Sequence, residues 1–165
     1  DGISKDDQTI IGNGQPTFQW GWNNTLNYKN FDFGLFIIGV HGFDIYNYTR
    51  EARFNTDGSV NLGPNPEWAN RWTPQNENSD IAGFVKTRNA LTPSSQYVEK
   101  GDFVMLNKAG INKVRVYASI QNPFLFTGYS GIDPEVTLKS PLTSGIDWGY
   151  YPNGRNYLIG LNFAF

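Results

Sequence analysis

The 165-residue sequence contains no cysteine and only one histidine, His41. Without cysteine the chain has no disulfide framework, no thiol nucleophile and no thiolate ligand for zinc. A single histidine with no matching motif supports neither a His-based zinc site nor a Ser-His-Asp triad. We therefore expect no enzyme activity and interpret His41 as a rim residue, where a strand meets its loop.

Long apolar runs and clusters of positive charge are missing too. The longest apolar stretch, Leu35 to Val40, is interrupted by Gly39 and falls well short of the roughly 18 residues of a transmembrane helix. The formal net charge is −2 and no Lys/Arg cluster could follow a phosphate backbone, so we expect no nucleic-acid partner. If this chain meets a membrane, it does so through strands.

Large aromatic residues are abundant. Twelve Phe, nine Tyr and five Trp make up 16% of the chain, and Gly, Pro and Asn interrupt it throughout. Large apolar rings in a chain that is otherwise polar suit β-strands with one apolar and one polar face. The composition predicts an all-β fold.

Alternation of apolar and polar residues predicts five strands. From Phe18 to Tyr28, five of the six even-numbered residues are large and apolar, and none of the odd-numbered ones is. Lys29-Asn30 predicts a tight turn. In the next strand the alternation fails at Phe36, Ile38 and Val40, which indicates burial on both faces against another protein element. The five predicted strands cover residues 18–28, 31–40, 95–106, 113–121 and 157–165.

Two long polar connections, 42–93 and 122–156, contrast with the short turns. Short turns at one end and long loops at the other are typical of outer-membrane barrels, and five strands are fewer than the roughly eight of the smallest ones. The chain would then form only some of the strands of a larger barrel wall. Its strand aromatics would form girdles facing lipid, and we assign Trp20, Trp22, Tyr28, Phe31 and Tyr157 to them.

Several motifs occur in a specific order along nearly the whole chain: Gly21-Trp22-Asn23-Asn24-Thr25, Gly42 to Asn47, Asn70 to Pro74, Ser94 to Phe103, Arg115 to Asn122, and Tyr129 to Glu135. Together they resemble the C-terminal part of SusC-type (SusC/RagA family) TonB-dependent transporters. One departure lies after Leu106, where family members continue with about a strand's worth of chain that this sequence lacks.

The resemblance implies the C-terminal strands and long extracellular loops of an antiparallel transmembrane β-barrel of roughly 22 strands. Residues 1–165 would be a partial β-barrel domain of a bacterial outer-membrane protein, without the plug domain and the N-terminal strands. The whole protein would import oligosaccharides or peptides together with a SusD-like surface lipoprotein. TonB would supply the energy through the plug region, which this chain does not contain.

Aromatic residues of the loops are the candidate contacts for substrate or for the lipoprotein cap, because flat apolar faces with polar edges suit both tasks. The alternative is that they pack the loops into an ordered collar. These residues are Tyr46, Tyr48, Trp68, Trp72, Tyr129, Trp148, Tyr150 and Tyr151.

The last predicted strand carries a second candidate signal. Its alternate residues resemble the C-terminal signal read by the barrel-assembly machinery, in which a strand adds to an exposed edge and its aromatic residue anchors in a pocket. These residues are Tyr157, Ile159, Leu161, Phe163 and Phe165.

Carboxylates form two further groups. Asp1-Gly2-Ile3 with Asp6 and Asp7 resembles half of a calcium loop, so we consider a Ca²⁺ site there, against an ordinary acidic periplasmic turn. Asp133 and Glu135 could be an acid and base, but their loop position favours a structural role.

A β-sandwich is the alternative fold for the same strands. A secreted carbohydrate-binding module of that kind would bury the aromatic faces between two sheets and bind sugar with its loops.

Overall fold

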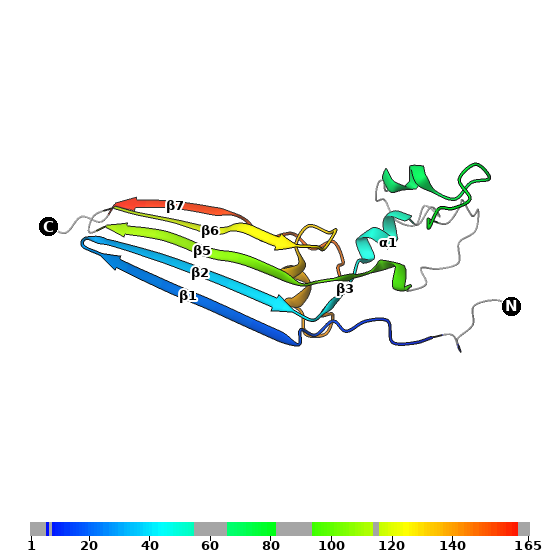
Figure 1. Cartoon of the computed structure of the whole chain (residues 1–165), viewed down its shortest axis with the longest axis horizontal. Helices are drawn as coiled ribbons and strands as arrows, with labels where there is room; N and C mark the ends of the chain where they lie inside the picture. The colour runs from blue at the N-terminus through cyan, green and yellow to red at the C-terminus, as the bar shows by residue number, and fades with distance from the viewer. Residues whose placement is uncertain (1–5, 7, 55–65, 82–93, 114–115, 162–165) are drawn as a thin grey trace.

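The computed structural model describes residue 6 and residues 8–54, 66–81, 94–113 and 116–161 (Figure 1). Five antiparallel strands form one long sheet in the order β1-β2-β5-β6-β7. The prediction of an all-β fold is confirmed. The strands are β1 (Phe18–Tyr28), β2 (Phe31–His41), β5 (Phe103–Lys113), β6 (Val116–Thr127) and β7 (Asn156–Leu161).

Short turns and long connections lie at opposite ends of this sheet. The β1–β2 turn has Lys29 at φ 53° and closes one end. The long connections gather at the other end, around a two-stranded sheet (Figure 1). They contain β3 (Asp44–Tyr46), α1 (Tyr48–Phe54), η2 (Pro66–Asn70), η3 (Ser95–Tyr97), β4 (Val98–Lys100) and η4 (Pro134–Leu138).

The strand predicted over 95–106 is wrong in its first half. Residues 95–100 form η3 and β4, and β4 leaves the long sheet to pair with β3. The break falls at Gly101, where an added Cβ would lie 2.4 Å from the Phe43 ring, and at Asp102, whose Oδ1 accepts a hydrogen bond from the Gly42 N–H at 2.8 Å. Long-range packing, which local alternation does not report, decides this boundary.

Two irregularities shape the middle of the sheet. The pairing of β5 shifts by one residue at Asn107 relative to β2, so its alternation changes phase there. The β5–β6 register shifts between Leu106 and Lys108, where Asn122 of β6 has φ 51°. β5 continues to Lys113, past the predicted end at residue 106, so the predicted start of the next strand at residue 113 is wrong. β6 runs from Val116 to Thr127, beyond the predicted end at residue 121.

One face of the sheet is apolar on every strand, and we call it the aromatic face. Residues paired directly across antiparallel strands lie on the same face of the sheet. The aromatic face extends across the strands through the pairs Trp22–Ile37, Ile37–Leu106 and Leu106–Phe124. Leu26 is 61% exposed and Ile159 79%. The face includes Trp20, Trp22, Leu26, Tyr28, Phe31, Phe33, Ile111, Val116, Ile120, Phe126, Tyr157, Ile159 and Leu161.

The five girdle residues predicted above therefore do lie on one face. In the described part of the chain no second sheet covers this face, so the β-sandwich alternative is wrong. Among the described residues, no helix is long and apolar enough to cross a membrane.

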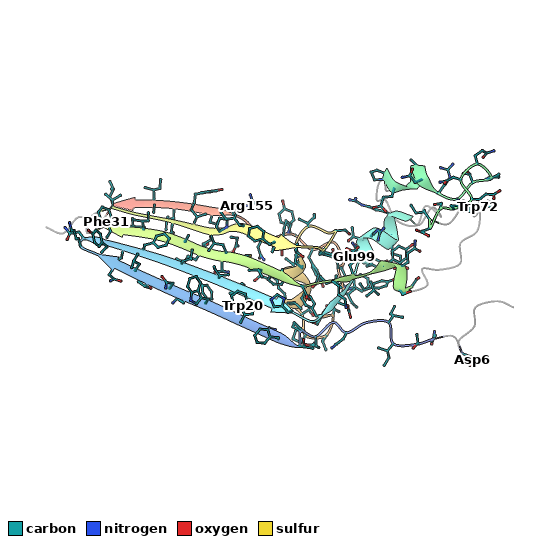
Figure 2. The ribbon with its side chains drawn as sticks, viewed as in Figure 1. Asp6, Trp20, Phe31, Trp72, Glu99 and Arg155 are labelled. Atoms are coloured by element: carbon teal, nitrogen blue, oxygen red, sulfur yellow. The ribbon has the colours of Figure 1, made fainter. Side chains whose placement is uncertain are left out.

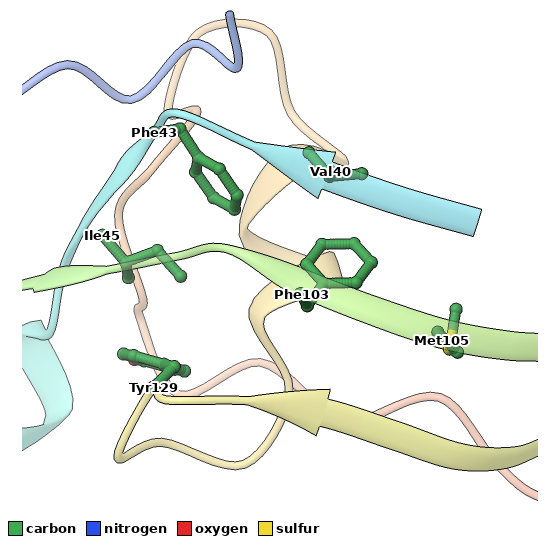
Figure 3. Packing of buried hydrophobic residues seen from close by; sticks show 6 residues of the cluster. All are labelled: Val40, Phe43, Ile45, Phe103, Met105 and Tyr129. Atoms are coloured by element: carbon green, nitrogen blue, oxygen red, sulfur yellow. The ribbon is translucent and has the colours of Figure 1, made fainter. Parts of the chain in front are cut away.

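The opposite face is covered at its loop end by the chain's own connections. Val40, Phe103 and Met105 of the sheet pack with Phe43, Ile45 and Tyr129 of the connections (Figure 3). The rings of Phe43 and Phe103 meet edge to face at 6.5 Å. Ile38 packs against the same cluster, which explains why the alternation of β2 fails there. These loops account for Ile38 and Val40 only: Phe36 is not part of the cluster, and the face of β2 that carries Phe33 is not buried in the described structure, so burial of both faces stays a prediction.

Candidate functional site at the loop end of the sheet

The loop end of the sheet is held together by backbone pairing between segments far apart in sequence, and we call it the rim collar (residues 12–17, 42–54, 94–101 and 128–153). Asp44 N–H donates to Asn13 O at 2.7 Å, and Tyr46 N–H donates to Gly145 O at 2.6 Å. Asp147 N–H donates to Tyr46 O at 2.9 Å. These bonds pair the edge of β3 that does not face β4 with Asn13 on one side and with residues 145–147 on the other.

Asp44 joins three of these segments. Its Oδ1 accepts from Lys100 Nζ at 2.7 Å and its Oδ2 from the Asn13 N–H at 3.0 Å. The Lys100 ammonium, and then the Asn13 N–H, hold the pKa of the Asp44 carboxyl below its usual range. The same ion pair raises the pKa of Lys100.

Glu99 of β4 is the centre of a polar network between α1 and the 128–133 loop. Its Oε1 accepts from Ser130 Oγ at 2.7 Å and from Asn47 Nδ2 at 3.1 Å, and its Oε2 accepts from the Ser130 N–H at 2.8 Å. Arg50 Nη1 lies 3.8 Å from Oε1. Figure 2 shows Glu99 between the sheet and α1. Asn47 also caps α1 by accepting from the Arg50 N–H at 2.8 Å.

Two tyrosine–carboxylate bonds fix the inner part of the collar. Tyr129 is buried and its hydroxyl donates to Asp147 Oδ2 at 2.5 Å; Tyr46 donates to Glu51 Oε2 at 2.5 Å. Burial, and then the bond to the carboxylate, raise the pKa of both hydroxyls above their ordinary value. Both tyrosines therefore stay neutral donors at physiological pH.

A cleft of about 390 Å³ opens between α1 and two segments of the 128–153 connection. Its volume lies near the lower end of the range for small-molecule sites. The cleft is lined by polar groups of both charges and by Ile132 and Tyr150; the main polar lining residues are Thr49, Arg50, Arg53, Glu67, Ser130, Asp133 and Asp147.

The predicted loop aromatics separate into two groups. Tyr46 and Tyr129 pack and hydrogen-bond within the collar, as the alternative interpretation proposed. Tyr48 and Trp148 form a pair with ring centroids 4.5 Å apart, and Trp148 is 50% exposed.

The other predicted aromatics are also at the surface. Tyr150 is exposed at the cleft and Tyr151 is 93% exposed. Trp72 is 46% exposed and lies farther from the sheet (Figure 2). Trp68 lies in η2, but its side chain is outside the described part of the structure.

The carboxylates Asp133 and Glu135 both receive bonds from Asn153. Its Nδ2 donates to Asp133 Oδ2 at 3.2 Å and to Glu135 Oε2 at 2.5 Å, while Asp133 Oδ1 caps η4 through the Glu135 N–H. Burial, and then the charge of Asp133, raise the pKa of Glu135. These contacts match the loop-structuring role expected for the pair.

His41 ends β2 at the rim, as expected. Its ring stacks beside Phe18 and Trp20 at 6.4 and 6.5 Å, and its Nδ1 lies 3.7 Å from Asp102 Oδ2.

The predicted C-terminal signal is only partly described. Tyr157, Ile159 and Leu161 share the aromatic face on β7, whereas Phe163 and Phe165 lie outside the described residues.

The calcium site stays a prediction. Asp1 and Asp7 lie outside the described residues, and within the described part, which includes Asp6, no three His, Cys, Asp or Glu side chains are grouped to hold a metal.

Sequence reasoning missed Glu99, Asp147 and the cleft. Glu99 bonds to residues 31 and 52 positions away, so no local pattern could reveal it. Asp147 has a local signal, because its Oδ1 accepts from the Gly149 N–H at 2.8 Å in an Asx turn.

No family model matches the chain. Among curated proteins it is similar to TonB-dependent receptor P3 of Formosa agariphila, with 36% identity over 183 residues covering 99% of this chain and 18% of that protein. It is also similar to the TonB-dependent receptor SusC of Bacteroides thetaiotaomicron, with 30% identity over 153 residues covering 88% of this chain and 15% of SusC. The chain thus spans less than one fifth of the length of these relatives.

The alignment with receptor P3 is longer than the chain itself, so P3 carries residues that have no counterpart here. Among solved structures, the chain resembles one of the RagAB peptide transporter, with a TM-score of 0.80 and 21% identity over 98% of this chain and 19% of that one. An 'open-open' RagAB structure gives a TM-score of 0.71 over 90% of this chain. These likenesses support the barrel-wall fold.

Proposed function

Since this chain belongs to the SusC-type TonB-dependent receptors, we propose that it forms part of the wall and outer rim of an outer-membrane transporter. The observation that carries the proposal is the aromatic face, which is apolar on all five strands and exposed in the isolated sheet. In water such a face is an aggregation hazard, whereas in a bilayer it is the required surface.

Strand length supports the same function. β1, β2 and β5 have 11 residues each. At roughly 3.3 Å per residue and a tilt of about 40°, such a strand spans about 28 Å along the membrane normal, close to the apolar band of outer-membrane barrels. In the described sheet β1 and β7 each pair with one neighbour, and lipid offers no partner for their other edges. Further strands of the whole protein would complete this pairing.

The whole protein would import oligosaccharides or peptides, with a SusD-like lipoprotein at the rim and TonB acting through a plug domain. The relatives are named TonB-dependent receptor and SusC, and the structural neighbours are described as a peptide transporter. In this chain the rim collar would line the external entrance. The exposed aromatics Trp148, Tyr150 and Tyr151 of the collar, and Trp72 in the loop beyond it, are available to the substrate or to the lipoprotein. We propose no catalytic step.

The experiment compares two tryptophans with similar exposure in the full-length receptor. Trp22 is 49% exposed in the middle of β1, and Trp72 is 46% exposed in a loop. We expect Trp22→Arg to cost about 2–4 kcal/mol of barrel stability if Trp22 faces the bilayer midplane, and Trp72→Arg to cost little. The readout is the heat-modifiable folded band in the outer-membrane fraction. Equal yields for both variants would refute the lipid-facing assignment.

A further inference from the structure

We infer that Tyr117 sets the register of β7 on β6 by covering Gly160, and thereby fixes the depth at which the apolar residues of β7 stand in the membrane. This role goes beyond the proposed wall function, because it concerns how the chain selects one strand pairing over its alternatives. Three features support it: the contact of the Tyr117 ring with Gly160, the alternation of β7, and the long connection between β6 and β7.

Tyr117 of β6 and Gly160 of β7 are direct partners in the sheet. A Cβ added to Gly160 would fall on the Tyr117 side chain, with two ring carbons and the hydroxyl as its nearest atoms. The ring therefore lies over the glycine and fills the space of the missing side chain, an arrangement that helps to fix strand register. Of the six residues of β7, only Gly160 is not exposed. Any other residue at this position would have to displace the ring.

The alternation of β7 excludes a register slip of one residue but not a slip of two. A one-residue slip would turn the apolar side chains of β7 away from the aromatic face, which the proposed lipid-facing role forbids. A two-residue slip, about 7 Å along the strand, would keep them on that face. It would, however, bring Leu158 or Asn162 opposite Tyr117 in place of Gly160, and either side chain would meet the ring. The ring thus discriminates between registers that hydrophobicity leaves equivalent.

The connection between β6 and β7 is too long to set their register. A two-residue turn, Lys29-Asn30, fixes the register of β1 on β2, whereas residues 128–155 separate β6 from β7. The side-chain bond from Asn156 Nδ2 to Gln121 Oε1, at 3.1 Å, also joins direct partners of the two strands. Both of these residues are exposed, so water can replace either partner at little cost.

The register can be measured by disulfide formation in the full-length receptor, with any cysteine outside this chain replaced. The chain itself contains no cysteine. Ala118→Cys is combined with Ile159→Cys, which reports the register of the structure, because Ala118 and Ile159 are direct partners. Combined instead with Tyr157→Cys or Leu161→Cys, it reports the two-residue slip in one direction or the other.

The receptor is oxidised in the outer-membrane fraction, and the disulfide yields of the three pairs are compared. Direct partners have Cβ atoms about 4.5–5.5 Å apart and diagonal neighbours about 7–8 Å, so we expect the pair at 118 and 159 to give at least about fivefold more disulfide than either offset pair. In Tyr117→Ser each offset pair should gain at least about threefold in yield, because two-residue slips are no longer blocked. Tyr117→Phe keeps the ring and should keep the wild-type ratio.

Glycine variants test the other half of the contact. Gly160→Ala should lower the yield of the heat-modifiable folded form at least about threefold, and Tyr117→Ser in the same chain should restore it, because the added methyl group then has room. Gly34→Ala is the matched control: Gly34 lies on the same face of the sheet, and a Cβ added there meets nothing within 4 Å. Its folded yield should equal that of the wild type.

Three results overturn the register role: wild-type disulfide ratios in Tyr117→Ser, equal folded yields of Gly160→Ala and Gly34→Ala, or no recovery when Tyr117→Ser is added to Gly160→Ala. A Tyr117→Ser receptor that does not fold at all would also overturn it, because the ring would then hold β7 in place rather than select its register. Failure of the proposed wall function has a different signature, equal yields of the Trp22→Arg and Trp72→Arg variants, and leaves the disulfide ratios unchanged.

Discussion

Removing the Tyr129 hydroxyl tests whether the rim collar is held by its buried polar bonds. Tyr129→Phe keeps the ring in the apolar cluster of Figure 3 but leaves Asp147 Oδ2 without its 2.5 Å partner. Because Asp147 is buried, a carboxylate oxygen left without its donor should cost about 1.5–3 kcal/mol. The sheet itself should be unaffected, since Tyr129 lies beyond the end of β6.

The suitable assay is amide hydrogen exchange of the full-length receptor, read in peptides that cover 126–150. A cost of 1.5–3 kcal/mol in local opening corresponds to about ten- to hundredfold faster exchange. Tyr151→Phe is the control, because its ring is almost fully exposed. Since the pKa of Tyr129 is raised, its contribution should be present at neutral pH and decline above about pH 10, where the unfolded-state hydroxyl ionises first. Exchange no faster than in Tyr151→Phe would refute the reasoning.

Three further predictions concern other parts of the chain. Asp44 has a lowered pKa, so its contribution to collar stability is present above about pH 3.9 and is lost as pH falls through the folded-state pKa; thermal unfolding should show this acid sensitivity in the wild type and not in Asp44→Asn. Gly39→Ala would place a Cβ 2.3 Å from the Trp20 ring and should lower the unfolding temperature by the equivalent of about 1–3 kcal/mol, with partial recovery in combination with Trp20→Leu. Deleting Phe165 from the full-length protein should impair outer-membrane insertion, and a normal yield of the heat-modifiable form would contradict the assembly-signal hypothesis.

The strand pattern was predictable because a half-buried strand repeats every two residues. In β1, β2 and β7 the apolar phase of the sequence is the phase that the register places on the aromatic face. Prediction failed where the period breaks. The bulge at Asn107 reverses the apolar–polar alternation of β5. The alternation therefore did not predict that the residues before and after Asn107 form one strand.

The aromatic loop residues show a different kind of limit. By sequence Tyr129 and Trp148 are equivalent, each a large ring in a polar connection. Only the fold separates them: Tyr129 packs on Phe103 and Met105 inside the collar, whereas Trp148 stays half exposed beside the cleft. Whether each ring is buried or exposed depends on the residues it packs against. Those residues lie far away in the sequence, so no local pattern predicts the outcome.

By itself, the sequence determined the strand-rich class, the apolar phase of most strands, the contrast of short turns with long loops, and the family. These properties follow from local alternation and motif order. The tertiary structure decided that β4 leaves the long sheet, that Glu99 and Asp147 tie the collar together, and that a cleft opens beside α1. Each depends on contacts between distant segments, which form only when the chain folds and brings those groups within hydrogen-bonding distance.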